Sequence, residues 1–290
     1  MTFTPAQLEE RRKHLGSSEI AAVCGLSPYR GPFDVWAEHV GLCEPFAGNE
    51  YTRWGERLED DIADAYAATH PGVDIQTCET RQHSEHPWMA ATPDRLILSS
   101  DDGRWLLECK APSWRQLFRW GDEGTSNIPE EYLAQVLWQL YVLDLQRCDV
   151  AAFFGGACYR EYSVMRGQCA ELESAIIAEA TRFWNEHVIP QKAPPVDGTG
   201  ATLRYLANKY RDHNDEIRPS SAEAEVAAKR LRNLRRTRSA TGKDIAVEEN
   251  RLKAIIADSA GIDTSCGRIM WRRSKAGTRR FQVPREWEAE

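Results

Sequence analysis

The chain has 290 residues, 42% of them hydrophobic, and a formal net charge of −7. This length can bury a sizeable core and suits one large domain, or one domain with an appendage. The charge is unevenly placed, because residues 1–190 carry a net charge of −14 and residues 191–290 a net charge of +7. The acidic total argues against a simple basic DNA-binding protein, and only the second part would attract a polyanion without help from metal ions or local arginines.

The sequence also argues against a membrane protein and against a protein that binds metal through cysteine thiolates. No run of about 18 apolar residues occurs, and the N-terminal segment lacks the apolar centre of a signal peptide. The eight cysteines include no CxxC pair, so neither a zinc ribbon nor a redox dithiol is predicted. We therefore expect a cytoplasmic protein with reduced thiols and no membrane partner.

Helical and strand patterns alternate through the first 190 residues. Helical periodicity and capping residues predict helices over residues 5–14, 17–24, 32–40, 50–69, 113–120, 129–145 and 166–188. Alternating patterns between turn residues predict strands over residues 73–79, 88–98, 104–110, 148–154 and 159–164. Together they predict an α/β (α+β) domain over residues 1–190, in which helices flank a small mixed central sheet.

A Pro- and Gly-rich stretch, IPQKAPPVDGTG at residues 189–200, predicts a connection to a second part. Beyond it, helices are predicted over residues 201–213, 221–238 and 244–259, the last two as a helical hairpin. Strands over residues 268–273 and 279–283 predict a short β-ribbon. Residues 191–290 are therefore expected to form a basic C-terminal appendage.

The stretch ATPDRLILSSDDGRWLLECKAP, residues 91–112, has the pattern of a β-hairpin around the turn residues 99–103. Glu108 and Lys110 are two apart on one strand, so their side chains leave the same face of the sheet. Leu107 and Cys109 point the other way. Taken alone, this pattern is also that of an ordinary solvent-facing hairpin.

A divalent cation is the other explanation of this hairpin. Mg²⁺ is usually held by one or two carboxylates together with waters and substrate phosphate, and Asp94 and Glu108 can supply such a pair across the hairpin. The backbone carbonyl of Cys109 can join them. The Lys110 ammonium would then stabilise developing negative charge or orient a water molecule. This is the chemistry of phosphodiester hydrolysis.

A third carboxylate is expected from the helix YTRWGERLEDDIADAYAATH, residues 51–70. The apolar stripe that marks its buried face consists of Trp54, Leu58, Ile62, Ala65 and Tyr66. Glu59 lies beside this stripe and is expected to face the metal site. The acids at positions 56, 60, 61 and 64 are assigned to the solvated face.

Two basic stretches lie in the appendage. KRLRNLRRTRSATGK, residues 229–243, holds seven basic residues and no acid, and is either a phosphate-tracking surface or an exposed helix face balanced by acids on the next helix. RIMWRRSKAGTRRF, residues 268–281, is the stronger candidate for DNA contact, through Arg272 and Arg273. A purely structural ribbon is the alternative.

Aromatic residues near the hairpin also have two interpretations. The tryptophans at positions 114, 120 and 138 are predicted to be core residues. Trp114 and Arg115, however, come shortly after Lys110 in the chain. They are therefore also candidates for a wedge near the end of a DNA duplex.

The combination of Glu59 on a helix, Pro-Asp at 93–94 and Glu-Cys-Lys at 108–110 resembles the PD-(D/E)XK nuclease superfamily. Three further stretches narrow the resemblance to the YqaJ viral recombinase family, relatives of the phage lambda exonuclease. They are RRKHLGSSEIAAVCGLSPYRGPFDVW (11–36), WGERLED (54–60) and PEEYLAQVLWQLYVLDL (129–145). Together they cover about residues 11–165 in the family's order.

The resemblance implies a restriction-endonuclease-like core and a Mg²⁺-dependent exonuclease, for which Mn²⁺ substitutes. Such an enzyme degrades one strand of linear double-stranded DNA from a 5′ end and leaves 3′ single-stranded overhangs for recombination. The resemblance assigns Asp94 and Glu108 to the metal and Lys110 to the attacking water. Glu59 matches a glutamate that reaches the metal through or near water, and Gln135 matches a glutamine on the helix that lines the site.

The resemblance also implies DNA-end contacts and partners. Arg11 and Ser18 match the arginine and serine that hold the 5′-phosphate. A helix N-terminus suits an anion, although plain capping explains the Gly-Ser-Ser segment equally well. The implied partners are double-stranded DNA ends, a single-strand annealing protein and further copies of the chain in a trimeric ring, in the cytoplasm of a bacterial host if the chain is phage-encoded.

The chain departs from the family at one position. Some members carry a metal-binding carboxylate about ten residues before Pro-Asp, where RQHSEHPWMAA, residues 81–91, has Glu85 as its only acid. A single-metal site is therefore an alternative. Two other functions stay open: an endonuclease or structure-specific nuclease of the same superfamily, and a non-catalytic DNA-end-binding recombination accessory protein.

Overall fold

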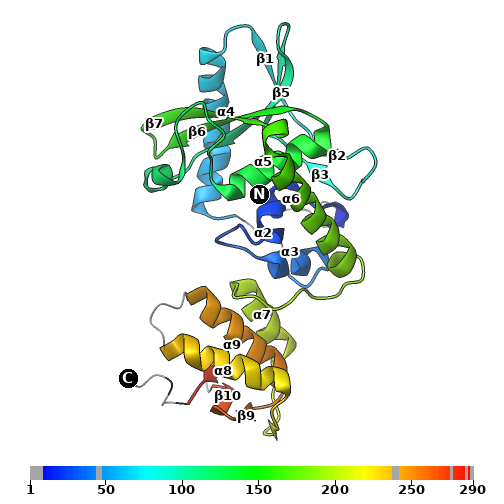
Figure 1. The fold of residues 1–290 in the computed structure, drawn as a ribbon, viewed down its shortest axis with the longest axis vertical. Helices are drawn as coiled ribbons and strands as arrows, with labels where there is room; N and C mark the ends of the chain where they lie inside the picture. The colour runs from blue at the N-terminus through cyan, green and yellow to red at the C-terminus, as the bar shows by residue number, and fades with distance from the viewer. Residues whose placement is uncertain (1–8, 44–47, 237–241, 275–276, 285–286, 288–290) are drawn as a thin grey trace. The chain divides into compact units, whose positions relative to one another are not determined.

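The computed structural model describes residues 9–43, 48–236, 242–274, 277–284 and 287. These residues form two compact units (Figure 1). The first contains the described residues up to Pro28 together with Glu38–Pro190, and the second contains Tyr29–Ala37 together with those from Gln191 onward. The sequence predicts one domain over residues 1–190, whereas in the structure Tyr29–Ala37 groups with the residues of the second unit.

A mixed sheet lies at the centre of the first unit. Within the described residues its five strands follow the order β1-β4-β5-β6-β7. Neighbouring strands are antiparallel except β5 and β6, which are parallel. The strands are β1 (Val73–Thr77), β4 (Arg95–Ser99), β5 (Gly103–Lys110), β6 (Arg147–Phe154) and β7 (Cys158–Met165). This mixed sheet with flanking helices confirms the predicted fold class.

Helices cover both faces of this sheet. The helical segments of the first unit are α2 (Ser17–Val23), α4 (Glu50–Thr69), the 3₁₀ helix η1 (Trp114–Arg119), α5 (Glu130–Leu143), the 3₁₀ helix η2 (Arg166–Cys169), α6 (Ala170–Phe183) and the π-helical turn η3 (Trp184–Val188). α4 packs through Ile62 and Tyr66 on the face that carries Leu107 and Cys109. α5 contacts the other face, where Glu108 lies.

Three details of the first unit correct the predictions. The expected strand over residues 88–98 is interrupted, because β3 (Ala90–Ala91) pairs with β2 (Arg81–Gln82) in a separate small sheet. The expected helix over residues 113–120 is the 3₁₀ helix η1. Trp54, predicted in the buried stripe of α4, is 51% exposed. The predicted helix over residues 5–14 lies partly outside the described residues.

The second unit has its own core. Its helices are α3 (Pro32–His39, up to Ala37), α7 (Gly200–Lys209), α8 (Ala222–Arg236) and α9 (Gly242–Ile256), and its strands are β8 (Ile217–Arg218), β9 (Gly261–Thr264), β10 (Gly267–Arg273) and β11 (Arg279–Gln282). Leu231, Leu252 and Trp271 are buried together in this core. The predicted hairpin of α8 and α9 is present, but the predicted ribbon is part of a four-stranded sheet in the order β11-β10-β9-β8 among the described residues.

Candidate active site

The β4–β5 hairpin positions Asp94 and Glu108 next to each other. Arg95 pairs with Leu107 in the antiparallel register, so one step further along the two strands Asp94 comes opposite Glu108. Asp94 accepts a hydrogen bond at Oδ2 from the backbone N–H of Cys109, at 2.7 Å. The register of the hairpin therefore places the two predicted carboxylates opposite each other.

Glu108 is the centre of a polar cluster on the α5 side of the sheet. Its side chain is 2% exposed, and Lys110 Nζ lies 2.5 Å from its Oε1. Gln135 donates to the same oxygen at 2.6 Å, and Gln139 donates to Oε2 at 2.9 Å. Lys110 also donates to Gln135 Oε1 at 3.2 Å. The structure thus joins Glu108, Lys110 and Gln135, three of the predicted residues, in one network.

The charges in this cluster perturb each other strongly. Burial, with the Glu108 carboxylate beside it, raises the pKa of Asp94 to about 8. Burial alone would lower the pKa of Lys110, but the carboxylates of Glu108 and Asp94 hold it above its ordinary value. Two crowded carboxylates therefore share one ammonium in this cluster.

This crowding is the property that a divalent cation would relieve. Asp94 and Glu108 offer carboxylate oxygens, and the Cys109 carbonyl beside them is also an oxygen donor. Hard cations such as Mg²⁺ prefer donors of this kind. The residues present therefore fit a Mg²⁺ or Mn²⁺ ion.

The Glu59 carboxylate also raises the pKa of Asp94, but its hydrogen-bond partner is an arginine. α4 carries Glu59 on the opposite side of the sheet from Glu108, and Arg95 Nη1 donates to Glu59 Oε1 at 2.5 Å. Arg95 also bonds the Asp60 carboxylate and the Asp94 carbonyl. No three His, Cys, Asp or Glu side chains form a metal-binding group in the described part of the chain. Arg95 therefore holds the Glu59 carboxylate, and a role for Glu59 through or near water stays a prediction.

Of the predicted 5′-phosphate residues, Ser18 lies in the first turn of α2 and Arg11 precedes this helix. Arg11 and Ser18 are both exposed. The start of α2 is already capped by an acid, because Glu19 Oε2 accepts a hydrogen bond from the Gly16 N–H at 2.9 Å. The same oxygen lies 3.3 Å from His39 Nε2. Capping of α2 is thus observed, and phosphate binding by Arg11 and Ser18 stays a prediction.

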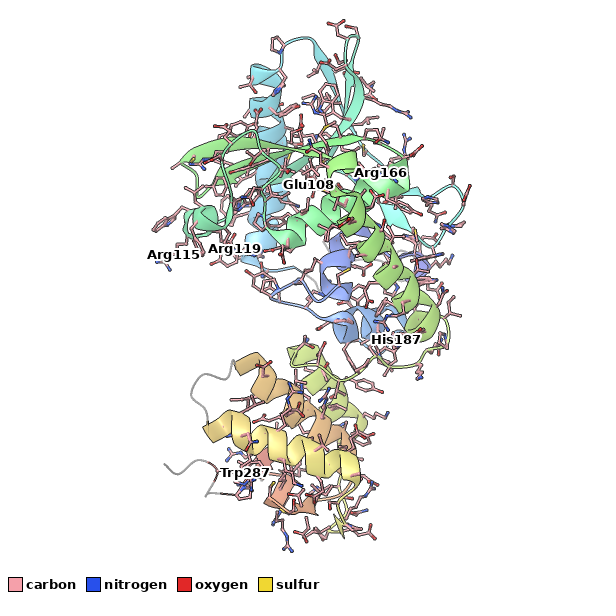
Figure 2. All side chains as sticks on the ribbon, in the orientation of Figure 1. Glu108, Arg115, Arg119, Arg166, His187 and Trp287 are labelled. Carbon is pink, nitrogen blue, oxygen red and sulfur yellow. The ribbon has the colours of Figure 1, made fainter. Side chains whose placement is uncertain are left out.

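The segment η1 presents aromatic rings to solvent. Trp114 is 67% exposed and Phe118 is 86% exposed, so the prediction of Trp114 as a core residue is wrong. Arg115 is also exposed and projects outward at the edge of the first unit, whereas Glu108 lies in its interior (Figure 2). Gly155 supports this segment, because its N–H donates to the Pro112 carbonyl at 3.0 Å. These exposed rings leave the wedge interpretation of Trp114 and Arg115 in place.

Two arginine side chains on the basic strands of the second unit already have partners within this unit. Arg273 pairs with Asp212, and Arg279 donates to backbone carbonyls that include those of Trp271 and Ser259. Trp271 is buried and offers no ring for base stacking. Arg272 and Arg273 are both exposed. Their predicted contact with DNA stays a prediction.

Residues 7–146 match the model of the YqaJ-like viral recombinase domain. The chain is 30% identical over 208 residues to the uncharacterized protein YqaJ of Bacillus subtilis (strain 168), a match that covers 71% of this chain and 63% of that protein. It is 31% identical over 150 residues to the uncharacterized protein R354 of Acanthamoeba polyphaga mimivirus, over 49% of this chain and 27% of that protein. The chain therefore spans less than two thirds of either relative.

Solved structures similar to this chain include two that are named as exonucleases. The alkaline exonuclease LHK-Exo from Laribacter hongkongensis has a TM-score of 0.48 and 18% identity, over 63% of this chain and 94% of that chain. A phage related exonuclease from Haemophilus somnus 129PT has a TM-score of 0.44 and 10% identity, over 61% of this chain and 96% of that chain. Both likenesses are distant, so the activity of the first unit is inferred from its own residues.

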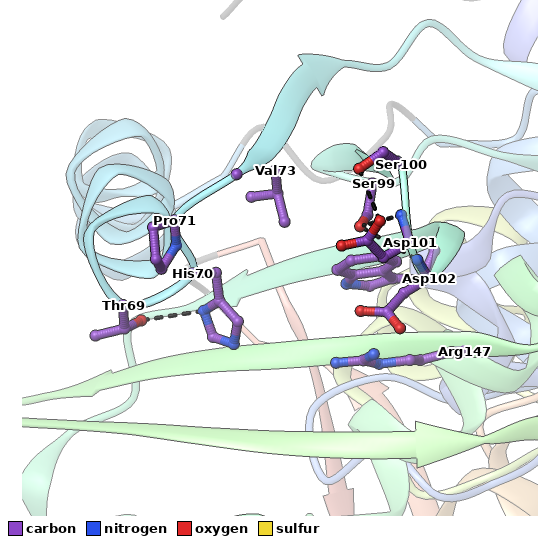
Figure 3. Close-up of a pocket in the computed structure, with 11 residues that line it drawn as sticks. Thr69, His70, Pro71, Val73, Ser99, Ser100, Asp101, Asp102 and Arg147 are labelled. Atoms are coloured by element: carbon purple, nitrogen blue, oxygen red, sulfur yellow. Dashed lines mark hydrogen bonds between the residues drawn. The ribbon is translucent and has the colours of Figure 1, made fainter.

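A cavity of about 350 Å³ lies at the turn end of the β4–β5 hairpin, where Ser99, Asp101 and Asp102 line it (Figure 3). Its lining includes His70 and Arg147 and none of the predicted site residues. The ring of His70 stacks on a buried tyrosine, and Arg147 pairs with Asp149. Each of these two groups already has a partner of its own, and the lining shares no residue with the candidate active site.

Sequence reasoning missed two residues of the first unit that contact the site. Gln139 lies one helical turn after Gln135, and this spacing alone places both amides on one face of α5. Arg95 follows Asp94 directly, but its pairing with Glu59 depends on where α4 packs. The spacing of the two glutamines could have indicated the contact of Gln139 with Glu108, but nothing in the sequence indicated the pairing of Arg95 with Glu59.

Among the helices that the structure describes, none has the length and apolar character needed to cross a bilayer.

Proposed function

We propose that this chain is a divalent-cation-dependent exonuclease that degrades one strand of linear double-stranded DNA from its 5′ end and leaves a 3′ overhang for recombination. The observation that carries the proposal is the cluster of Asp94, Glu108 and Lys110 at one end of the β4–β5 hairpin. Two buried carboxylates that share a single ammonium group cost folding stability. A site that has to hold a cation and a phosphodiester accounts for this cost.

The chain's own residues have distinct roles in this proposal. Asp94, Glu108 and the Cys109 carbonyl hold Mg²⁺ or Mn²⁺, which when bound lowers the pKa of water and neutralises phosphate charge. Lys110 is held protonated, because its pKa is raised, so it stabilises the developing negative charge and orients the water instead of removing a proton. Gln135 hydrogen-bonds both Lys110 and Glu108 and so holds the two side chains in position relative to each other.

The DNA contacts are assigned to exposed groups. Arg11 and Ser18 bind the 5′-phosphate at the end of the duplex. Trp114 and Arg115 on η1 contact the strand next to the reacting phosphate, because an exposed ring can stack on any base and a guanidinium can pair with a phosphate. Arg272 and Arg273 add salt-sensitive affinity from the second unit.

The wider assignments follow from the same proposal. A single-strand annealing protein takes up the 3′ overhang, further copies of the chain assemble as a ring around the duplex, and the enzyme works in the cytoplasm. In this proposal the first unit is the nuclease and residues 191–290 act as a basic appendage.

The test is cleavage of a linear duplex that carries a 5′-phosphate and a fluorophore at either its 5′ or its 3′ end. With Mg²⁺ we expect release of the 5′ label as a mononucleotide and a shortening ladder from the 3′ label. Glu108→Gln should remove the activity. Asp101→Asn, the same chemical change at the other end of the hairpin, should leave it intact, because Asp101 is exposed and lies in the turn.

The alternatives give different results in the same assay. Cutting of a covalently closed circle would indicate an endonuclease or structure-specific nuclease. Retention of DNA ends in EDTA, with no cleavage in Mg²⁺ or Mn²⁺, would indicate a non-catalytic DNA-end-binding accessory protein. Either result would overturn the exonuclease proposal.

A further inference from the structure

Gln139 is a buried amide in an apolar part of α5. Its side chain is 0% exposed, and its neighbours along the helix, Val136, Leu137, Trp138 and Leu140, are buried and mostly aliphatic. Nε2 of Gln139 donates to Glu108 Oε2 at 2.9 Å. The amide therefore connects the interior of α5 to the carboxylate at the centre of the candidate site.

The carbonyl oxygen of the Gln139 side chain has no hydrogen-bond partner among the described residues. Oε1 of Gln139 is buried and accepts no hydrogen bond from the described residues. A buried acceptor without a donor destabilises the folded state, so an apolar side chain of similar size would suit the fold better at this position. The contact with Glu108 is then the feature that explains a glutamine here.

The two amides of α5 divide the Glu108 carboxylate between them. Gln135 and Gln139 are one helical turn apart, and they donate to Oε1 and Oε2 respectively. Lys110 also bonds Oε1, so Oε1 receives two donors and Oε2 receives the amide of Gln139. Without Gln139 the carboxylate would keep donors on one oxygen only and could rotate about its last bond.

We propose that Gln139 is a positioning residue that fixes the orientation of the Glu108 carboxylate for binding a divalent cation. This inference rests on the proposed function for the identity of the cation. Gln139 touches neither the cation nor DNA in this proposal. It acts through Glu108, as hydrogen-bonding partners behind metal ligands do elsewhere, where their loss weakens metal affinity by about 10–100-fold.

The experiment compares wild type, Gln139→Met and Val136→Ala in the full chain. Gln139→Met keeps the length of the side chain and removes the donor, whereas Val136→Ala removes buried volume from the same helix and no bond to Glu108. Mn²⁺ binding is measured by calorimetry, thermal unfolding is measured without metal, and cleavage is measured as a function of Mn²⁺ and DNA concentration.

We expect Gln139→Met to unfold at or above the wild-type temperature and to bind Mn²⁺ about 10–100-fold more weakly. Cleavage should approach the wild-type rate at saturating Mn²⁺, with an unchanged KM for DNA. Val136→Ala should unfold at a lower temperature with unchanged Mn²⁺ affinity. Wild-type Mn²⁺ affinity in Gln139→Met, or an equal loss of affinity in Val136→Ala, would overturn the inference.

The inference and the proposed function can fail separately. If wild type binds Mn²⁺ but does not cut DNA, the nuclease proposal fails, and weaker Mn²⁺ binding by Gln139→Met still supports the positioning role. If wild type cuts DNA and Gln139→Met binds Mn²⁺ normally, the positioning role alone fails. A wild-type protein that binds no Mn²⁺ overturns both.

Discussion

Lys110 Nζ lies 2.5 Å from Glu108 Oε1. An ammonium group is therefore ion-paired with the carboxylate that is proposed to hold a divalent cation. Both groups are largely buried, and their attraction is screened less than that of a surface pair. The cation and Lys110 thus compete for the same negative charge.

Lys110→Met should separate cation binding from catalysis. Removing the ammonium relieves its repulsion of the cation, and we expect Mn²⁺ affinity to rise roughly ten-fold. Cleavage should fall by about 10³-fold, because no positive side chain remains to stabilise the transition state. Calorimetry and the duplex assay give the two numbers, and weaker Mn²⁺ binding in the variant would contradict the competition.

Asp94→Asn and Glu59→Gln should differ in severity. Asp94 faces the cluster, whereas the Glu59 carboxylate is held by Arg95 on the other side of the sheet. We expect Asp94→Asn to lower cleavage by about 10³-fold and Glu59→Gln by about ten-fold, the range for an indirect contact. Equal losses in the two variants would show that Glu59 reaches the reacting groups after all.

Gly155→Ala should disturb η1 more than Gly156→Ala does. Both glycines have positive φ, 56° and 78°, so alanine is strained at either position. At Gly155 the added methyl group would also lie 3.0 Å from Trp114 Cβ, while at Gly156 it meets nothing within 4 Å. We expect Gly155→Ala to lower the free energy of unfolding by about 1 kcal/mol more than Gly156→Ala does.

The same pair tests the DNA contact of Trp114. If η1 binds DNA, Gly155→Ala should also weaken binding of a duplex end in Ca²⁺, and Gly156→Ala should not. Urea unfolding and fluorescence anisotropy measure the two effects. Equal DNA affinity in both variants, together with unequal stability, would remove Trp114 from the DNA-binding surface.

His39 should make the stability of the first unit depend on pH. Burial by itself lowers the pKa of His39, but the Glu19 carboxylate hydrogen-bonded to it holds it above the ordinary value of 6.5. Glu38 also favours the charged ring, and Arg12 contributes a backbone carbonyl. Because the folded pKa is raised, the stabilisation is fully present below about pH 6.5 and is lost as the pH rises through the folded pKa.

His39→Gln measures this contribution. The difference in unfolding free energy between wild type and the variant, from urea titrations, should be larger at pH 5.5 than at pH 9. Glu19→Gln is the control, because its amide oxygen can still cap Gly16 while the charge that holds the proton is gone. A difference that grows toward high pH would reverse the expected sign.

Local pattern was sufficient for much of the site. The alternation along residues 104–110 placed Glu108 and Lys110 on one face, and the turn at residues 99–103 brought Asp94 beside them. The helix over residues 50–69 was predicted with the bounds that α4 has. Strand periodicity and turn chemistry act over a few residues, which is why sequence alone determined the hairpin, its faces and the helix.

Only the tertiary structure decided which helix covers which face. α4 packs against Leu107 and Cys109, so Glu59 meets Arg95, while α5 brings Gln139 to Glu108. The exposure of Trp54 and the place of Tyr29–Ala37 in the second unit were decided in the same way. A helical pattern tells which side of a helix is apolar, but the surface that it meets is chosen by the burial of the whole chain, through contacts far apart in sequence.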